Sequence, residues 1–143
     1  MSDKQLQLKI LSPDRIIYRG PANAIGLPGE LGYMTVLPGH AAMVATLDIG
    51  TLALEKNGGS LEKLFIAGGF VDVGADGVTV LADVVEKSTE INVERAKKAL
   101  VRAEERLTST KRADDTVDLT RALAAKKRAQ CRLEMAGATK SGH

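Results

Sequence analysis

Aromatic residues are scarce in this chain of 143 residues, which has two Tyr, two Phe and no Trp. Its hydrophobic core must therefore be built from Val, Ile, Leu, Ala and Met. The single cysteine, Cys131, excludes an internal disulfide, which is typical of a reducing compartment. No apolar run approaches the roughly 18 residues that a membrane span needs, and residues 1–7 lack the order of a secretory signal. We therefore expect a folded cytoplasmic protein.

The sequence also lacks the motifs of the common enzyme classes. Residues 137–141 superficially resemble a phosphate-binding loop, but no glycine precedes Lys140. The only histidines, His40 and His143, lie far apart, and no Cys/His cluster has the spacing of a metal site. No Ser/His/Asp arrangement stands out. We therefore expect a protein that is not an enzyme and needs no cofactor.

Charge is divided unevenly along the chain. Residues 1–86 hold 6 basic and 10 acidic residues, a net charge of −4. Residues 87–143 hold 14 basic and 8 acidic residues, a net charge of +6. Such an asymmetry indicates two modules with different partners.

The first module has the pattern of β structure. Residues 5–11 alternate polar and apolar side chains, which is the period of a strand with one buried face. Further short apolar segments follow at residues 22–27, 51–54, 61–67, 69–73 and 78–83. The turn residues Asn57-Gly58-Gly59 and Ala75-Asp76-Gly77 separate neighbouring segments, because Gly and Asn tolerate the positive φ of tight turns. Many short strands with glycine-rich turns predict a sandwich or barrel.

The second module has the pattern of a helical hairpin. One helix is predicted from Asn92, its N-cap, to Leu107, and a second over residues 117–135, capped by Asp115 or Thr116 and ended by Gly137. The apolar stripes that face each other are rich in alanine, which buries little area per residue. Two interpretations follow: a hairpin that is released at low cost, as a switch requires, or a permanently docked pair of helices.

Four segments of the chain have the character of motifs: residues 29–41, with Leu37-Pro38-Gly39-His40-Ala41; residues 65–73, with Gly68-Gly69; residues 78–83; and residues 91–96, Ile91-Asn92-Val93-Glu94-Arg95-Ala96. Together, in this order over nearly the whole chain, they resemble the epsilon subunits of bacterial F-type ATP synthases. The resemblance implies a flattened ten-stranded β-sandwich over residues 1–86. It further implies a C-terminal antiparallel two-helix hairpin over residues 87–143, with a short flexible tail.

The resemblance also implies a role and a location. The chain would be a non-catalytic rotor subunit on the cytoplasmic face of the bacterial inner membrane, with the gamma subunit, the ring of c subunits and the beta subunit as partners. The sandwich would bind gamma and the c-ring, with Glu30 and His40 as contact candidates. The hairpin would inhibit ATP hydrolysis by docking on the beta subunit, with four basic candidates: Arg102, Arg106, Arg121 and Lys126. The alternatives are a solvated basic helix face and a turn histidine satisfied by backbone groups.

Some members of that family bind ATP on the folded hairpin as a regulatory ligand. Carried over by motif, the candidates here are Glu86, Ile91, Asn92, Arg95, Ala96, Arg128 and Arg132. Arginines suit phosphate groups because the guanidinium is planar and multidentate. Asn92 replaces the aspartate of the family, which keeps the helix cap and removes its negative charge. ATP binding and a simple cap with solvated arginines therefore both stay open.

Two further classes of protein compete with this interpretation. The basic hairpin would suit a nucleic-acid-binding module, but all the aromatic residues lie in the acidic half, so the basic half offers no base-stacking side chain. A small β-fold enzyme would need a convergent acid–base or nucleophile set, which the sequence does not offer.

Overall fold

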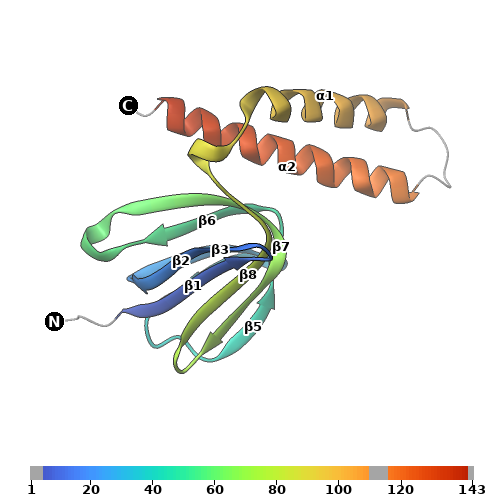
Figure 1. Ribbon diagram of the computed structural model, residues 1–143. Coiled ribbons are helices and arrows are strands. Elements are labelled where there is room, and N and C mark those ends of the chain that lie inside the picture. The colour runs from blue at the N-terminus through green and yellow to red at the C-terminus, as the bar shows by residue number, and fades with distance from the viewer. Residues whose placement is uncertain (1–4, 110–115, 142–143) are drawn as a thin grey trace. The chain divides into compact units, whose positions relative to one another are not determined.

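Strands make up the first half of the chain and two long helices the second (Figure 1). The computed structural model describes residues 5–109 and 116–141. The chain divides into two compact units, Met1–Lys87 and Ser88–His143.

The first unit is one sheet that folds over into two facing layers (Figure 1). The strand order is β2-β1-β8-β7-β6-β3-β4, with β5 added beside β7. Neighbouring strands are antiparallel except β1 and β8, which are parallel. The strands are β1 (Leu6–Ser12), β2 (Arg15–Ala22), β3 (Ala24–Gly29), β4 (Gly32–Val36), β5 (Met43–Thr46), β6 (Gly50–Glu55), β7 (Leu61–Gly74) and β8 (Gly77–Lys87). The prediction of a β-sandwich is confirmed.

Aliphatic side chains fill the space between the two layers. Leu6, Leu8 and Ile10 of β1 are buried while the intervening Gln7 and Lys9 are exposed, as the alternating pattern predicts. The remaining strands contribute Leu, Ile, Val and Ala, and every member of this core cluster lies between residues 6 and 85. The described residues include no buried polar or charged side chain. The first unit therefore contains a complete core of its own.

A glycine pair bends the two longest strands. In β7 the core positions change from Leu64 and Ile66 to Val71 and Val73, so the inward-facing parity changes at Gly68-Gly69. Both glycines have positive φ, 77° and 112°, which only glycine adopts readily. The halves of β7 pair with different strands, the first with β6 and the second with β5. The structure thus describes eight strands where ten were predicted, and the number becomes ten when each half of β7 and β8 is counted separately.

Hydrogen bonds and an ion pair connect strands at one corner of the sandwich. Asn23, between β2 and β3, donates its backbone N–H to Glu55 O (2.8 Å) and its side-chain amide to Lys56 O (3.2 Å). Lys56 forms an ion pair with Glu62 (2.7 Å) and lies 5.7 Å from the ring centroid of Tyr18. Strands distant in sequence are thereby held at this corner.

The first long helix of the second unit starts at the predicted N-cap. Helix α1 (Val93–Ser109) follows a short 3₁₀ turn, Ser88–Glu90. The Asn92 side-chain oxygen accepts a hydrogen bond from the Arg95 N–H (3.0 Å), and Asn92 O accepts one from the Ala96 N–H (3.0 Å). Both are the bonds of an N-cap, so this prediction is confirmed.

Helix α2 (Thr116–Ser141) packs against α1 in an antiparallel hairpin (Figure 1). Alanines form the seam, since Ala96 and Ala103 of α1 and Ala122 and Ala129 of α2 are all buried. The expected end at Gly137 is wrong, because α2 continues to Ser141 where a short tail was predicted. A polar break between the helices was predicted for residues 108–115, but α1 continues to Ser109. Residues 110–115, with the Asp115 cap, lie outside the described residues.

Candidate binding surfaces

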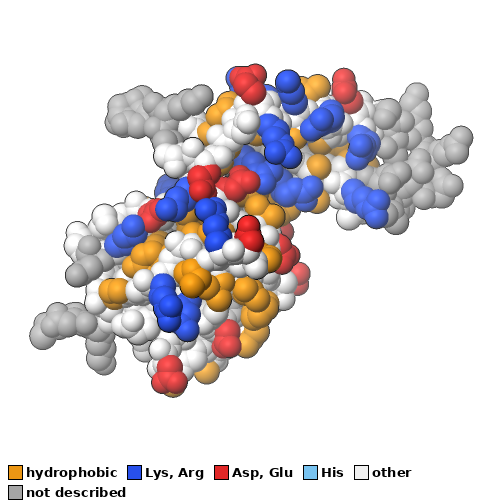
Figure 2. All heavy atoms as spheres, viewed as in Figure 1, with side chains coloured by type: hydrophobic (Ala, Val, Ile, Leu, Met, Phe, Trp, Pro, Cys, Tyr) orange, Lys and Arg blue, Asp and Glu red, His pale blue; other side chains and the backbone are white. Residues whose placement is uncertain are grey.

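Basic side chains are spread over the helical hairpin (Figure 2). Of the four predicted beta-contact residues, Arg102, Arg106 and Arg121 are exposed, whereas Lys126 is half-buried. The ion pair between Glu94 and Lys97 is long (3.9 Å) and exposed, so it adds little stability. The hairpin therefore presents cationic groups to solvent.

Three apolar side chains accompany these cations on the helices. Leu119 and Leu123 lie one turn apart on α2 and are 37% and 52% exposed, while Val101 of α1 is 53% exposed. Arg102 and Arg121 lie one and two positions away in sequence, so they point in other directions from the helices. Exposed apolar groups on helices that also carry cations suit contact with another protein.

The residues carried over for ATP binding fall into three groups. Ile91 and Ala96 are buried apolar residues, and the Asn92 oxygen is used by the helix cap. Arg95 is exposed on the first turn of α1, and Arg128 and Arg132 are half-buried on α2. Because the helices are antiparallel, the start of α1 lies beside the C-terminal half of α2 (Figure 1), so these arginines share one end of the hairpin. Glu86 belongs to strand β8 of the first unit and is half-buried.

Glu30 and His40 lie in two different loops of the sandwich. Glu30 is exposed at the β3–β4 turn, and its N–H donates to Thr46 O (2.9 Å). His40 is exposed after β4, with Nδ1 2.7 Å from Ala41 O and its backbone N–H donating to Leu37 O (3.1 Å). Leu31, next to Glu30, is fully exposed. Backbone carbonyl groups thus engage Nδ1 and the backbone N–H of His40, while the β3–β4 turn presents Glu30 and Leu31 together.

An apolar row crosses the outer face of the sandwich, and sequence reasoning missed it. The residues stand opposite one another on successive strands: Thr46 faces Phe70, Phe70 faces Leu81, Leu81 faces Leu11 and Leu11 faces Ile16. Ile16, Phe70 and Leu81 are 59%, 42% and 37% exposed. Figure 2 shows hydrophobic side chains gathered on the face formed by β1, β8 and β5. We call Leu11, Ile16, Phe70 and Leu81 the outer apolar row.

The described residues, 5–109 and 116–141, lack two features that are typical of other classes of protein. Those residues contain no group of three or more His, Cys, Asp or Glu side chains that could hold a metal ion. Among the same residues, no helix combines the length and the hydropathy that crossing a bilayer requires.

A sandwich with an exposed apolar row, joined to a hairpin with exposed cations, is typical of proteins that work by contact with other proteins. Family models define the chain further. Residues 5–88 match the model "ATP synthase, Delta/Epsilon chain, beta-sandwich domain", and residues 89–137 match "ATP synthase, Delta/Epsilon chain, long alpha-helix domain". The chain therefore belongs to the epsilon chain family of ATP synthases.

Curated relatives agree over almost their whole length. The ATP synthase epsilon chain of Moorella thermoacetica is 39% identical over 133 residues, which cover 93% of this chain and 97% of the relative. That of Symbiobacterium thermophilum is 43% identical over 134 residues, covering 93% and 94%. That of Bacillus velezensis is 41% identical over 134 residues, covering 94% and 98%.

Solved structures with this fold come from ATP synthase assemblies. A chain of the Euglena gracilis mitochondrial ATP synthase, solved with OSCP, F1 and c-ring, has a TM-score of 0.69 at 26% identity and covers 96% of this chain and 81% of its own. A chain from the central stalk and c-ring of the Tetrahymena thermophila enzyme has a TM-score of 0.64 at 14% identity, covering 93% and 98%. At 14% identity, the likeness to the Tetrahymena chain shows the fold alone.

Proposed function

We propose that this chain is a non-catalytic central-stalk subunit of a bacterial F-type ATP synthase that restrains ATP hydrolysis through its helical hairpin. It works peripherally at the cytoplasmic face of the inner membrane and couples the catalytic head to the c-ring. Its sandwich, residues 1–86, attaches to the gamma subunit and the ring, and the hairpin, residues 87–143, is regulatory. Membership of the epsilon chain family supports the position in the enzyme.

The alanine seam is the observation that carries the regulatory role. Ala96, Ala103, Ala122 and Ala129 are buried where the two helices meet, and a buried methylene contributes about 0.8 kcal/mol. A seam built of single methyl groups therefore contributes far less than a leucine seam of equal length. The helices can separate at low cost and present Arg102, Arg106, Arg121 and Lys126 to an acidic surface of the beta subunit.

Two surfaces of the sandwich suit its attachment. The outer apolar row is a candidate for the gamma subunit, because exposed apolar side chains in a continuous patch mark protein contacts. The β3–β4 turn, with Glu30 and the fully exposed Leu31, is a candidate for the c-ring. The Nδ1 atom and the backbone N–H of His40 are engaged by backbone carbonyl groups, so a contact with the c-ring would use another part of this exposed side chain.

Hydrolysis by an epsilon-depleted bacterial catalytic head tests the proposal. Three proteins are compared: the full chain, a truncation ending at Glu86, and the double variant Arg102→Glu/Arg121→Glu. The truncation keeps the whole core cluster of the first unit. We expect all three to bind and only the full chain to slow hydrolysis strongly, because the hairpin cations guide docking on the head.

Lys63→Glu provides the matched control, since Lys63 is an exposed basic residue of the sandwich. This variant should inhibit as the unmodified chain does. If the truncation inhibits as strongly as the full chain, the hairpin is not the inhibitory element. If no form binds the head of a closely matched organism, the central-stalk assignment fails.

A regulatory ATP site on the folded hairpin is a second candidate. It is favoured by Arg95, Arg128 and Arg132 at one end of the hairpin, two of them half-buried. Bound ATP would raise the melting temperature of the full chain, and Arg128→Ala would abolish that shift while Arg121→Ala would not. A melting temperature unchanged by millimolar ATP would eliminate this site.

A further inference from the structure

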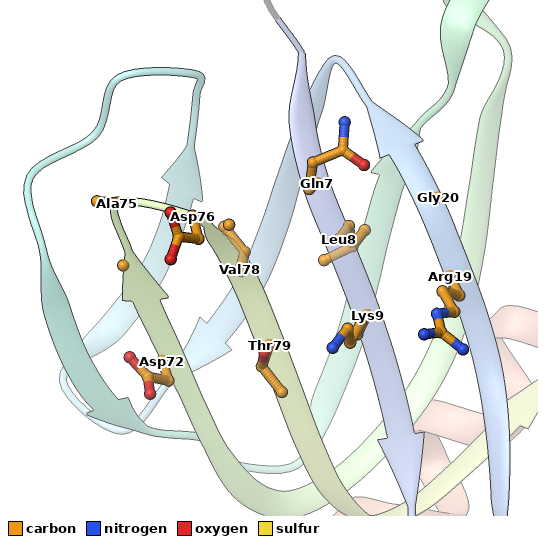
Figure 3. A pocket seen from close by; sticks show the side chains of 12 residues that line it. Gln7, Leu8, Lys9, Arg19, Gly20, Asp72, Ala75, Asp76, Val78 and Thr79 are labelled. Carbon is orange, nitrogen blue, oxygen red and sulfur yellow. The ribbon is translucent and has the colours of Figure 1, made fainter.

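Beside the outer apolar row runs a polar row on the same face of the sheet. Arg19 of β2 faces Lys9 of β1, Lys9 faces Thr79 of β8, and Thr79 faces Asp72 of β7. Figure 3 shows their side chains on adjacent strands. They line a shallow depression of about 340 Å³, and Asp76 of the β7–β8 turn also borders it. The depression is therefore basic at the β1–β2 side and acidic at the β7 side.

The basic side consists of two like charges in direct opposition. Lys9 and Arg19 are cross-strand partners in an antiparallel pair, and both are exposed. Like charges at such a position destabilise the pair. Asp72 is separated from Lys9 by a whole strand, at about twice the 4.8 Å spacing of neighbouring strands, so it does not relieve the repulsion.

This pairing is unusual for the domain in which it occurs. Residues 1–86 carry only 6 basic residues against 10 acidic ones, yet two of the six stand opposite each other. Lys56, another of the six, differs from Lys9 and Arg19 because it forms an ion pair with an acidic residue, Glu62. A repulsive pair in an acidic domain is readily explained if a negative group from outside lies between the two cations.

We propose that Lys9 and Arg19 together receive a carboxylate of the subunit that docks on the outer apolar row, and so set the register of that contact. This inference rests on the proposed function, which makes the docking subunit gamma. A guanidinium and an ammonium group provide charge-assisted donors on two sides of one carboxylate. The acidic groups Asp72 and Asp76 at the opposite side repel a second carboxylate, so the partner binds in one orientation.

A protein carboxylate suits this site better than an anionic membrane surface. Attraction to anionic lipids needs a cluster of several basic residues, whereas this face offers a pair bordered by Asp72 and Asp76. The domain as a whole is negative, which opposes a lipid surface of the same sign. A single side chain inserted beside apolar residues instead interacts with the local pair.

The test measures binding of the full chain to an epsilon-depleted bacterial catalytic head at low and at high salt. Lys9→Glu/Arg19→Glu should weaken binding about tenfold or more at low salt, and Lys9→Gln/Arg19→Gln less, with the difference shrinking as salt screens the pair. Lys63 is an exposed basic residue of β7 outside this face. The variant Lys63→Glu is therefore the control and should bind as the unmodified chain does. Thermal melts check that each variant is folded. In a second step, single Asp or Glu→Lys changes in gamma are screened for rescue of the charge-reversed chain.

Rescue by one acidic position of gamma would identify the carboxylate. Unchanged affinity of Lys9→Glu/Arg19→Glu, with the unmodified chain binding well, would overturn this inference and leave the proposed function intact. Failure of the unmodified chain to bind would overturn both. Binding to phosphatidylglycerol vesicles that the charge reversal abolishes, with head binding unaffected, would assign the pair to the membrane and overturn the inference.

Discussion

The side-chain oxygen of Asn92 lies 3.0 Å from the backbone nitrogen of Arg95 and caps helix α1. A neutral amide thus supplies the acceptor oxygen of this cap. The same oxygen is thereby engaged, which leaves the amide NH₂ as the polar group that Asn92 can offer to a ligand.

Removal of this cap should destabilise the start of the helical hairpin. We expect Asn92→Ala to cost about 1 kcal/mol of helix stability, because one N–H of the first turn loses its acceptor. Asn92→Asp is the control: it keeps the acceptor and adds a charge that the helix dipole favours. Amide hydrogen exchange of residues 93–96 measures the effect. Equal protection in Asn92→Ala and the unmodified chain would show that the cap is dispensable.

The bend in β7 should tolerate only glycine. A Cβ at Gly69 would overlap the carbonyl oxygen of Leu81 at a φ of 112°, so we expect Gly69→Ala to destabilise the sandwich by roughly 2 kcal/mol or more. Gly58→Ala is a matched control with φ 88° and open space around its Cβ, and it should cost about 1 kcal/mol. Urea unfolding of both variants compares them. The prediction fails if the two changes cost the same.

Enlarging the alanine seam should open the hairpin. Ala122 is completely buried, and Ala122→Leu inserts three carbons there, which typically costs about 1–3 kcal/mol in a packed interior. Gln130→Leu, on an exposed position of the same helix, should leave the hairpin closed. Spin labels placed on α1 and α2 would report the separation. If the proposed switch exists, Ala122→Leu will also inhibit hydrolysis more strongly than the unmodified chain.

The Lys56–Glu62 ion pair should stabilise the sandwich corner in a pH-dependent way. The hydrogen bond and charge of Glu62 raise the pKa of Lys56 above its ordinary value of 10.5. A raised pKa in the folded state means that the contribution is complete at neutral pH and is lost as pH rises through the folded pKa. Both side chains are partly exposed (39% and 29%), so the contribution is small.

A double-mutant cycle with Lys56→Met and Glu62→Gln measures that coupling. We expect a coupling below about 1 kcal/mol at pH 7 and none well above the Lys56 pKa. A coupling that grows with pH would contradict the assignment of charges. Tyr18→Leu, which removes the ring beneath Lys56, should leave most of the coupling in place.

Local features of the sequence were sufficient for much of the architecture. The alternation in residues 5–11 predicted β1, and Asn92 predicted the start of α1, since both signals depend on neighbouring residues alone. The end of α2 was predicted wrongly at Gly137. A glycine inside a helix costs about 1 kcal/mol, and here the helix continues past buried Met135 and Ala136 despite that cost.

The candidate sites also divide into those that local sequence predicts and those that only strand pairing creates. The basic residues of the hairpin were predictable because helical periodicity alone places them outside the seam. The opposition of Lys9 and Arg19, in contrast, depends on the register between two strands, which brings together residues ten positions apart in sequence.

By itself, therefore, the sequence determined the two modules, their secondary structure and their opposite charges, because these follow from composition and from the periods of strand and helix. Only the tertiary structure decided which side chains stand together on the outer face. The parallel pairing of β1 with β8 and the irregularity after Ile10 place Leu11 between Leu81 and Ile16. Strand register is set by packing of the whole core, and no local pattern contains that information.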